Sequence, residues 1–226
     1  MKIKVLIPLL VLAFIFGCAK AKEDGGVAEE EIVEVETAPM QAETASAAKS
    51  REAAAFKPFD VYTDKASPHN HYIPSGWMGD VSDITFNDIW TDSPHSGSTC
   101  IKIVYSNRAS NGARWAGLYW QSPANNWGSR KGGFDLTGAT KLTFWARGEN
   151  GGERIEEFKL GGITGDYPDS DSAGIGPVIL TKDWKQYTID LRGKDLSYIS
   201  GGFCWATNLD VNPDGATFYL DDIVYE

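Results

Sequence analysis

The chain has 226 residues, a formal net charge of −10 at pH 7, and eight tryptophans. A surplus of negative charge excludes binding to nucleic acid through a basic surface. The length allows one domain with a substantial core, together with shorter segments outside it.

Residues 1–17 have the pattern of an export signal. A basic start precedes an apolar run, residues 5–16, which is too short to span a bilayer comfortably. The three residues before Cys18 resemble the lipobox of bacterial lipoproteins, although Phe16 is bulkier than the usual small residue. The resemblance implies cleavage before Cys18, a lipid on that residue, and a protein held at the bacterial cell envelope, on the outer membrane or cell surface. The alternative is an ordinary secretory peptide with an unrelated cysteine.

Residues 18–56 continue from this cysteine as an acidic segment rich in Ala and Glu. Their apolar surface is too small to offset the entropy lost on ordering, so we predict a disordered tether. Such a tether lets a lipid-anchored domain reach away from the membrane. We predict one folded, monomeric domain over residues 57–226.

Within this domain, short alternating segments are separated by clusters of Gly, Asn, Asp and Ser, a pattern typical of strands. The predicted strands are residues 60–62, 81–87, 100–105, 115–121, 141–147, 156–161, 185–191, 202–206 and 217–225. Many short strands without a helical stripe predict an all-β fold, a two-sheet antiparallel β-sandwich or jelly roll.

The segment 112–128 concentrates large aromatic residues among small and amide residues. In the predicted strand 115–121, Trp115, Tyr119 and Gln121 share one face, while Leu118 and Trp120 belong to the other. An aromatic ring can cover the apolar face of a sugar ring while an amide bonds to its hydroxyls. The pattern therefore predicts a sugar-binding shelf. The alternative is that Trp115 and Tyr119 pack under a loop.

Four segments resemble one known family: FDLTGATKLTFWARG, EEFKLGG, LTKDWKQYTIDL and ATFYLDDIVYE. They are similar to carbohydrate-binding modules with the galactose-binding-domain-like jelly roll, which are appended to bacterial glycoside hydrolases. The resemblance covers most of residues 79–226. It implies a non-catalytic module that binds a polysaccharide or oligosaccharide on a concave sheet, and the negative charge favours a neutral glycan. The candidate sugar contacts are Trp115, Tyr119, Gln121, Trp127, Glu157, Lys159 and Trp205.

One of these candidates has a second interpretation. Trp205 shares a strand face with Phe203, which favours a place in the core. Trp145 and Arg147 share an outward face and are expected to stack on the opposite, convex side.

The same resemblance implies a structural calcium ion, with an Asp of the last strand as one ligand. Asp221 and Asp222 match that position, and Asp80 and Asp83 are candidates for further ligands. Alternation with Leu220 predicts that Asp222 points to the core, where a carboxylate needs a cation or hydrogen-bond donors. Oxygen ligands favour calcium over zinc or copper. The alternative is a solvated or Arg-paired strand end.

Two cysteines remain if Cys18 carries the lipid. Cys100 and Cys204 form an even pair in an exported domain, where a disulfide is permitted. Two free thiols are the alternative.

The chain has neither a Gly-x-Ser-x-Gly nucleophile motif nor a phosphate-binding loop, so we predict that it is not an enzyme. Two other functions stay open. One is an envelope lipoprotein for structural or protein interaction, with the same sandwich and no sugar site. The other is a small glycan-active hydrolase, which requires two carboxylates facing each other across a groove.

Overall fold

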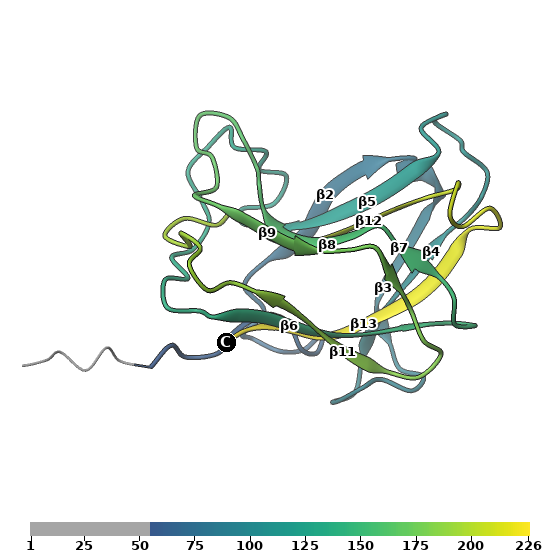
Figure 1. Ribbon diagram of the computed structural model, residues 1–226, viewed down its shortest axis with the longest axis horizontal. Helices are drawn as coiled ribbons and strands as arrows, with labels where there is room; N and C mark the ends of the chain where they lie inside the picture. The colour runs from purple at the N-terminus through teal and green to yellow at the C-terminus, as the bar shows by residue number, and fades with distance from the viewer. Residues whose placement is uncertain (1–54) are drawn as a thin grey trace, which may run out of the picture. The chain divides into compact units, whose positions relative to one another are not determined.

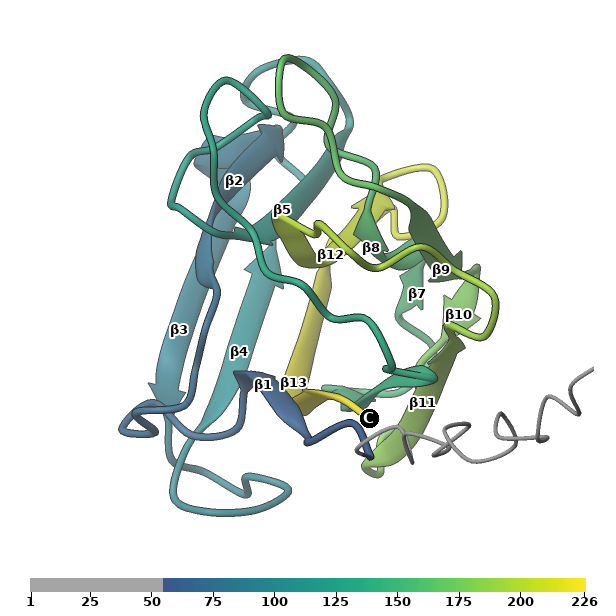
Figure 2. The same cartoon turned by 90° about the vertical axis from the view of Figure 1, so that its left-hand side faces the viewer.

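Two antiparallel sheets face each other in the computed structural model, which describes residues 55–226 (Figure 1). The first, the β13 sheet, has the order β11-β6-β13-β4-β3, with β1 also paired to β13. The second, the β5 sheet, has the order β2-β5-β12-β8-β9. Figure 2 shows the two sheets from the side as separate layers. The predicted all-β, two-sheet sandwich is confirmed.

The strands of the β13 sheet are β1 (Phe59–Tyr62), β3 (Ile84–Trp90), β4 (Cys100–Tyr105), β6 (Lys141–Gly148), β11 (Lys185–Asp190) and β13 (Ala216–Tyr225). Those of the β5 sheet are β2 (Ile73–Gly79), β5 (Trp115–Gln121), β8 (Glu157–Gly161), β9 (Ser172–Ile175) and β12 (Gly201–Asn208). A separate pair joins β7 (Arg154–Ile155) to β10 (Val178–Ile179), and a 3-10 turn, η1, spans Val81–Asp83. No helix among the described residues is long and apolar enough to cross a membrane.

The largest departure from the predicted strands is β2. Its sequence, IPSGWMG, contains one Pro and two Gly, which are depleted in strands. Proline is tolerated at an edge, and β2 is an edge strand of the β5 sheet. Three short strands were also missed, β7, β9 and β10. The strand predicted from residue 81 begins at Ile84, because η1 precedes it.

Aromatic side chains from both sheets fill the core. Phe144 of the β13 sheet lies 4.7 Å from Phe158 and 5.1 Å from Phe203 of the β5 sheet, measured between ring centroids. Trp205 and Phe218 meet across the layers edge to face, at 5.0 Å and 84°. Because the inner positions are fixed by this packing, the alternation along each strand also fixes which residues lie on the outer faces.

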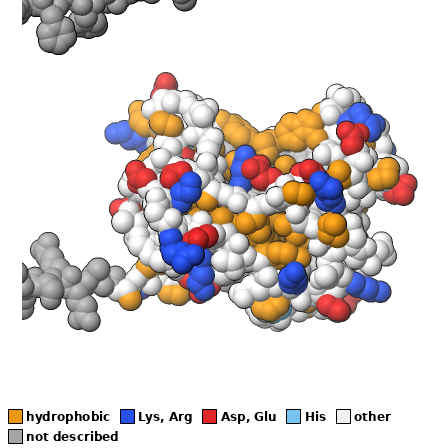
Figure 3. All heavy atoms as spheres, in the orientation of Figure 1, with side chains coloured by type: hydrophobic (Ala, Val, Ile, Leu, Met, Phe, Trp, Pro, Cys, Tyr) orange, Lys and Arg blue, Asp and Glu red, His pale blue; other side chains and the backbone are white. Residues whose placement is uncertain are grey.

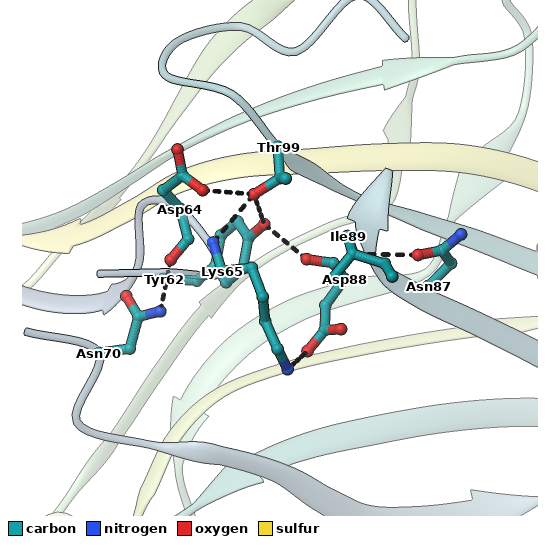
Figure 4. A network of polar contacts seen from close by, with 8 residues as sticks. All are labelled: Tyr62, Asp64, Lys65, Asn70, Asn87, Asp88, Ile89 and Thr99. Carbon is teal, nitrogen blue, oxygen red and sulfur yellow. Dashed lines mark hydrogen bonds and ion pairs between the residues drawn. The ribbon is translucent and has the colours of Figure 1, made fainter. Parts of the chain in front are cut away.

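A network of polar contacts ties the segment between β1 and β2 to the rest of the domain (Figure 4). Thr99 donates its hydroxyl to Asp64 at 2.6 Å, and this bond is the main reason why the pKa of Asp64 falls to about 2. Lys65 pairs with Asp88 at 2.5 Å. Tyr62 donates its hydroxyl to the Asp88 carbonyl at 3.0 Å. The network therefore joins β1 to the strands β3 and β4.

Candidate functional site

Small side chains occupy the middle of the outer face of the β5 sheet. Strand pairing places residues of neighbouring strands side by side in two rows across this face. One row is Met78, Gly117, Ala206 and Glu157, and the next is Gly76, Tyr119, Cys204, Lys159 and Gly174. Small residues thus alternate with larger ones in these rows, the Met78 side chain reaches over Gly117, and polar groups stand on β8.

Two exposed indoles stand at opposite ends of β5. Trp115, the first residue of the strand, is 40% exposed, and Trp127, in the loop that follows the strand, is 44% exposed. Trp127 contacts Tyr119, and Tyr119 lies four positions along the strand from Trp115, a distance of roughly 13 Å. Figure 3 shows the upper outline of the molecule dipping between two raised regions, with hydrophobic side chains on both sides of the dip. Apolar ring surface is thus available at both ends of the face.

Tyr119 lies on the predicted face, but its ring is covered. The side chain is only 4% exposed, and Lys159 extends over the ring with its ammonium 5.6 Å from the centroid. The Tyr119 hydroxyl donates to the Gly161 carbonyl at 3.0 Å, and burial raises the pKa of the phenol well above its usual value. The open shelf predicted at this residue is therefore wrong, and Tyr119 supports the residues that are exposed.

Gln121 is fully buried and both ends of its amide are used. Its oxygen accepts the hydroxyl of Ser75 at 3.0 Å, and its nitrogen donates to the Asn126 carbonyl at 3.1 Å. The predicted role of Gln121 as a group that bonds directly to a sugar does not fit this arrangement. Instead it fastens the loop that carries Trp127 to β5 and β2.

Glu157 and Lys159 lie on β8 at the polar side of the face. Their side chains form an ion pair at 3.1 Å and remain partly exposed. A pocket of about 450 Å³ adjoins them, lined also by Ser172 and Gly174 of β9. Both side chains can offer hydrogen bonds to a ligand on this face.

The structure corrects the prediction that Trp205 contacts a ligand. Its side chain is 0% exposed, and it faces the core between the inward-pointing Leu118 and Phe158 of the neighbouring strands. Sequence reasoning missed Trp77, which is 39% exposed and meets Phe86 edge to face at the open edge of the sandwich. No pattern in the sequence places Trp77 on a surface, because its segment was not predicted to be a strand.

Asp80 and Asp83, two of the predicted calcium ligands, are buried and saturated with hydrogen-bond donors from residues 106–114. Asp80 accepts backbone N–H groups of Asn111, Ala113 and Arg114, at 3.0, 3.0 and 2.6 Å. Asp83 accepts the backbone and side chain of Ser110, and these bonds lower its pKa. Both carboxylates fasten this loop.

Asp221 and Asp222 bind a different segment. Asp221 is fully buried on the outer side and accepts the backbone N–H of His95 at 2.9 Å, whereas Asp222 pairs with the His95 ring at 2.7 Å. Burial raises the pKa of Asp221 to about 7, and the charge of Asp222 adds to this. The prediction that Asp222 points to the core is wrong, because a bulge with a positive φ of 45° at Asp222 breaks the alternation.

These two acidic pairs therefore have separate partners. Within residues 55–226 no group of three or more His, Cys, Asp or Glu side chains is arranged to hold a metal ion. The donor sets do not fit a shared calcium site, and calcium binding stays a prediction from the resemblance alone.

Cys100 and Cys204, the two cysteines among the described residues, are free thiols. Cys100 lies on β4 of the β13 sheet and Cys204 on β12 of the β5 sheet, so the two side chains belong to different layers. The disulfide that the sequence permitted is not formed. Burial raises the pKa of both thiols, to about 12 for Cys100.

Comparison with known proteins identifies the class of fold. No family model and no curated protein matches the chain. Among solved structures, the family 30 carbohydrate-binding module of the cellulosomal cellulase Cel9D-Cel44B of Clostridium thermocellum is 15% identical, with a TM-score of 0.51. The match covers 75% of this chain and 97% of that chain.

Two further crystal structures of family 30 carbohydrate-binding modules are similar to the chain. Both are 16% identical, with TM-scores of 0.50 and 0.52. The matches cover 75% of this chain and 87% and 98% of theirs. The described residues therefore share the β-sandwich fold of these modules.

Proposed function

We propose that the chain is a non-catalytic carbohydrate-binding module that holds a neutral glycan on the outer face of the β5 sheet. The observation that carries the proposal is the pair of exposed indoles, Trp115 and Trp127, at opposite ends of the outer face of β5. The glycan would lie along this face, stack on the two indoles, and bond to Glu157 and Lys159.

Physical chemistry supports a sugar as the ligand. An indole exposes an apolar ring beside wet surroundings, which suits the apolar face of a sugar, and a partly exposed ion pair can bond to its hydroxyls. The chain's net charge of −10 favours a neutral glycan on this face. The solved structures of similar fold are named as carbohydrate-binding modules, which supports the same class of function. A shallow site with few contacts gives modest affinity.

An alternative is a protein-interaction lipoprotein with the same sandwich. It is favoured by the burial of Tyr119 and Gln121, which leaves fewer polar groups to recognise a sugar than the sequence suggested. A hydrolase has less support. The two rows across the face bring one carboxylate, Glu157, which is already paired with Lys159.

The deciding experiment is a titration of the full chain, kept in solution with detergent, against soluble neutral polysaccharides, followed by tryptophan fluorescence. We expect a saturable change that is lost in Trp115→Ala. Ile89→Ala serves as the control, because Ile89 is an exposed apolar side chain on β3 of the other sheet. A folded parent that binds none of the polysaccharides would favour the protein-interaction alternative, whereas equal binding by Trp115→Ala would remove Trp115 from the glycan site.

We further propose that a lipid on Cys18 and the tether that follows anchor this module at the bacterial cell envelope. Cys18 and residues 1–54 lie outside the described residues, and the proposal depends on the lipobox resemblance. Replacing Cys18 by Ser is expected to move the protein from the membrane fraction to the soluble fraction after cell lysis. Unchanged partition of the variant would contradict the anchor and leave the glycan proposal untouched.

A further inference from the structure

A pocket of about 720 Å³ lies on the outer face of the β13 sheet, on the other layer from the proposed glycan face. Its lining includes three aromatic residues, Trp90, Trp184 and Tyr219, and three cations, Lys102, Arg147 and the exposed Lys182. No part of the proposed function uses this pocket.

Strand pairing builds the floor of the pocket. Lys102 of β4 and Arg147 of β6 are the direct neighbours of Tyr219 on the central strand β13, one on each side. The Arg147 guanidinium carbon lies 3.7 Å from the Tyr219 ring centroid, and the Lys102 ammonium lies 4.0 Å from that of Trp90. Cations attracted to ring faces in this way are held in place. The floor is therefore a pair of pre-positioned positive groups.

Neither of the two floor cations has an anionic partner within residues 55–226, where no ion pair involves Lys102 or Arg147. Every other arginine side chain in that part of the chain donates at least one hydrogen bond within the protein. Arg147 donates none there, although a guanidinium carries five N–H donors in a planar fork that matches a carboxylate. The pocket thus offers an unused site for an anionic group.

The surroundings of the cations restrict the ligand. Three carboxylates also line the pocket: Glu149, which accepts the hydroxyl of Tyr219, and the exposed Asp92 and Asp183. They would repel a densely charged group such as a phosphate or sulfate cluster. Carboxylate and amide groups at a rim can instead accept and donate bonds to hydroxyls, and Asn150 adds such an amide. A ligand with one carboxylate and several hydroxyls satisfies both parts of the pocket.

We propose that this pocket binds a uronic acid residue of an acidic saccharide. The carboxylate accepts two parallel N–H bonds from Arg147 and one from Lys102, and the hydroxyls bond to Glu149 and Asn150. The chain's net negative charge opposes an anion at long range, but salt screens this repulsion beyond about 8 Å at physiological ionic strength. The site is independent of the glycan face, so the module would carry two sites of different specificity on its two layers.

Calorimetric titration of the full chain in detergent tests this proposal, with a galacturonic acid trisaccharide and its carboxyl-reduced counterpart as the probes. We expect the acidic trisaccharide to bind and the reduced one to bind much more weakly. Replacing Arg147 by Gln should weaken binding of the acidic probe by roughly 10- to 100-fold, because a charge-assisted bond is lost. Arg147→Lys keeps the positive charge but loses the planar fork of N–H donors, so its affinity for the acidic probe should lie between those of the parent and Arg147→Gln.

Trp115→Ala is the matched control, because it alters the other layer and should leave binding of the acidic trisaccharide unchanged. Both probes are also titrated into Trp115→Ala, so that binding of the neutral reduced probe on the β5 sheet is excluded. Equal binding of the two probes by Trp115→Ala, full binding of the acidic probe by a folded Arg147→Gln variant, or no binding of the acidic probe by the parent would each overturn the proposal. Loss of acidic binding in Trp115→Ala would also overturn it, by moving the site to the β5 sheet. Because the neutral glycan is measured separately, failure of either proposal leaves the other intact.

Discussion

The indole of Trp127 meets the ring of Tyr119 edge to face, with centroids 5.8 Å apart and planes at 84°. This contact lets one residue do two things, since Trp127 covers Tyr119 and still exposes 44% of its own surface. The loop that carries Trp127 is in turn fastened by the buried amide of Gln121. The exposed indole is therefore held in a fixed place relative to β5.

The first prediction concerns this indole. Trp127→Ala removes one of the two exposed rings and uncovers Tyr119, so we expect neutral glycan binding to weaken by roughly 3- to 10-fold. Trp127→Tyr keeps a ring at the same position and should retain most of the affinity. Fluorescence titration measures both variants, and a normal melting temperature shows that the fold is intact. Unchanged affinity in Trp127→Ala would remove this residue from the site.

A second prediction separates core from surface. Trp205 is fully buried, so Trp205→Ala should lower the free energy of unfolding by about 3 to 5 kcal/mol, whereas exposed Trp115→Ala should lower it by less than about 1 kcal/mol. Urea denaturation of the two variants makes the comparison. Similar losses would mean that Trp115 is packed and not available to a ligand.

Third, Gln121→Leu is expected to destabilise the domain by about 1 to 3 kcal/mol, because the Ser75 hydroxyl and the Asn126 carbonyl lose a buried partner. The same change should weaken glycan binding, since the loop that carries Trp127 is no longer fastened. Gln186→Leu, at an exposed position on β11, is the matched control and should do neither. Chemical denaturation and titration of both variants test the link between loop and site.

Fourth, the domain should not depend on a disulfide. Reducing agent is expected to leave the melting temperature unchanged, because Cys100 and Cys204 are free and lie in different layers. Both thiols are buried and their pKa values are raised, so neither should react with a thiol reagent until the chain is denatured. A melting temperature that falls on reduction would show that a disulfide forms.

The fifth prediction is a pH dependence of stability that comes from Asp221. Its pKa is raised to about 7 in the folded chain by burial and by the charge of Asp222, while an unfolded Asp titrates near about 3.9. The folded state therefore keeps a proton that the unfolded state loses between about pH 4 and 7. Stability from this group is full below about pH 4 and is lost as the pH rises toward 7.

Asp222→Asn removes the second cause of the raised pKa, so the loss of stability with rising pH should be smaller in this variant. Melting temperatures of the parent and the variant from pH 4 to 8 provide the comparison. An Asp221→Asn variant measured beside them separates the contribution of Asp221 from that of the Asp222–His95 pair, which Asp222→Asn also removes. Parallel curves would show that Asp222 has no influence on the proton held by Asp221.

The strands with clear alternation could be predicted from the sequence. Their inner and outer faces follow from period-two patterning, as in β5, where Trp115 is outside and Trp120 is inside. The edge strand β2 could not be predicted, because its Pro and Gly residues are rare in strands. With β2 missing, the partner of Gln121 was missing too, since Ser75 belongs to that strand.

The arrangement of the candidate site on the β5 sheet could also be predicted only in part. Single-strand patterning placed Trp115 and Lys159 on the outer face of the β5 sheet, where the structure also has them. It could not show that Lys159 and Trp127 cover Tyr119, because the first contact joins two separate strands and the second depends on the path of the loop after β5. A bulge also shifts the alternation of inward and outward side chains near Asp222, and no local sequence pattern predicts this bulge.

The hydrogen bond between Thr99 and Asp64 affects how the domain responds to a pulling force. A pull on the chain ahead of Phe59 reaches β1 first, and this strand has only four residues, paired to residues 223–225 at the C-terminal end of β13. If β1 peels away, the load passes to the hydrogen bonds of Asp64, which hold the next segment to the start of β4. The amino-terminal end of the domain, where a membrane tether would pull, is therefore held by two attachments in series: the pairing of β1 with β13 and the hydrogen bonds of Asp64. The first can separate while the two sheets that carry the proposed sites stay packed together.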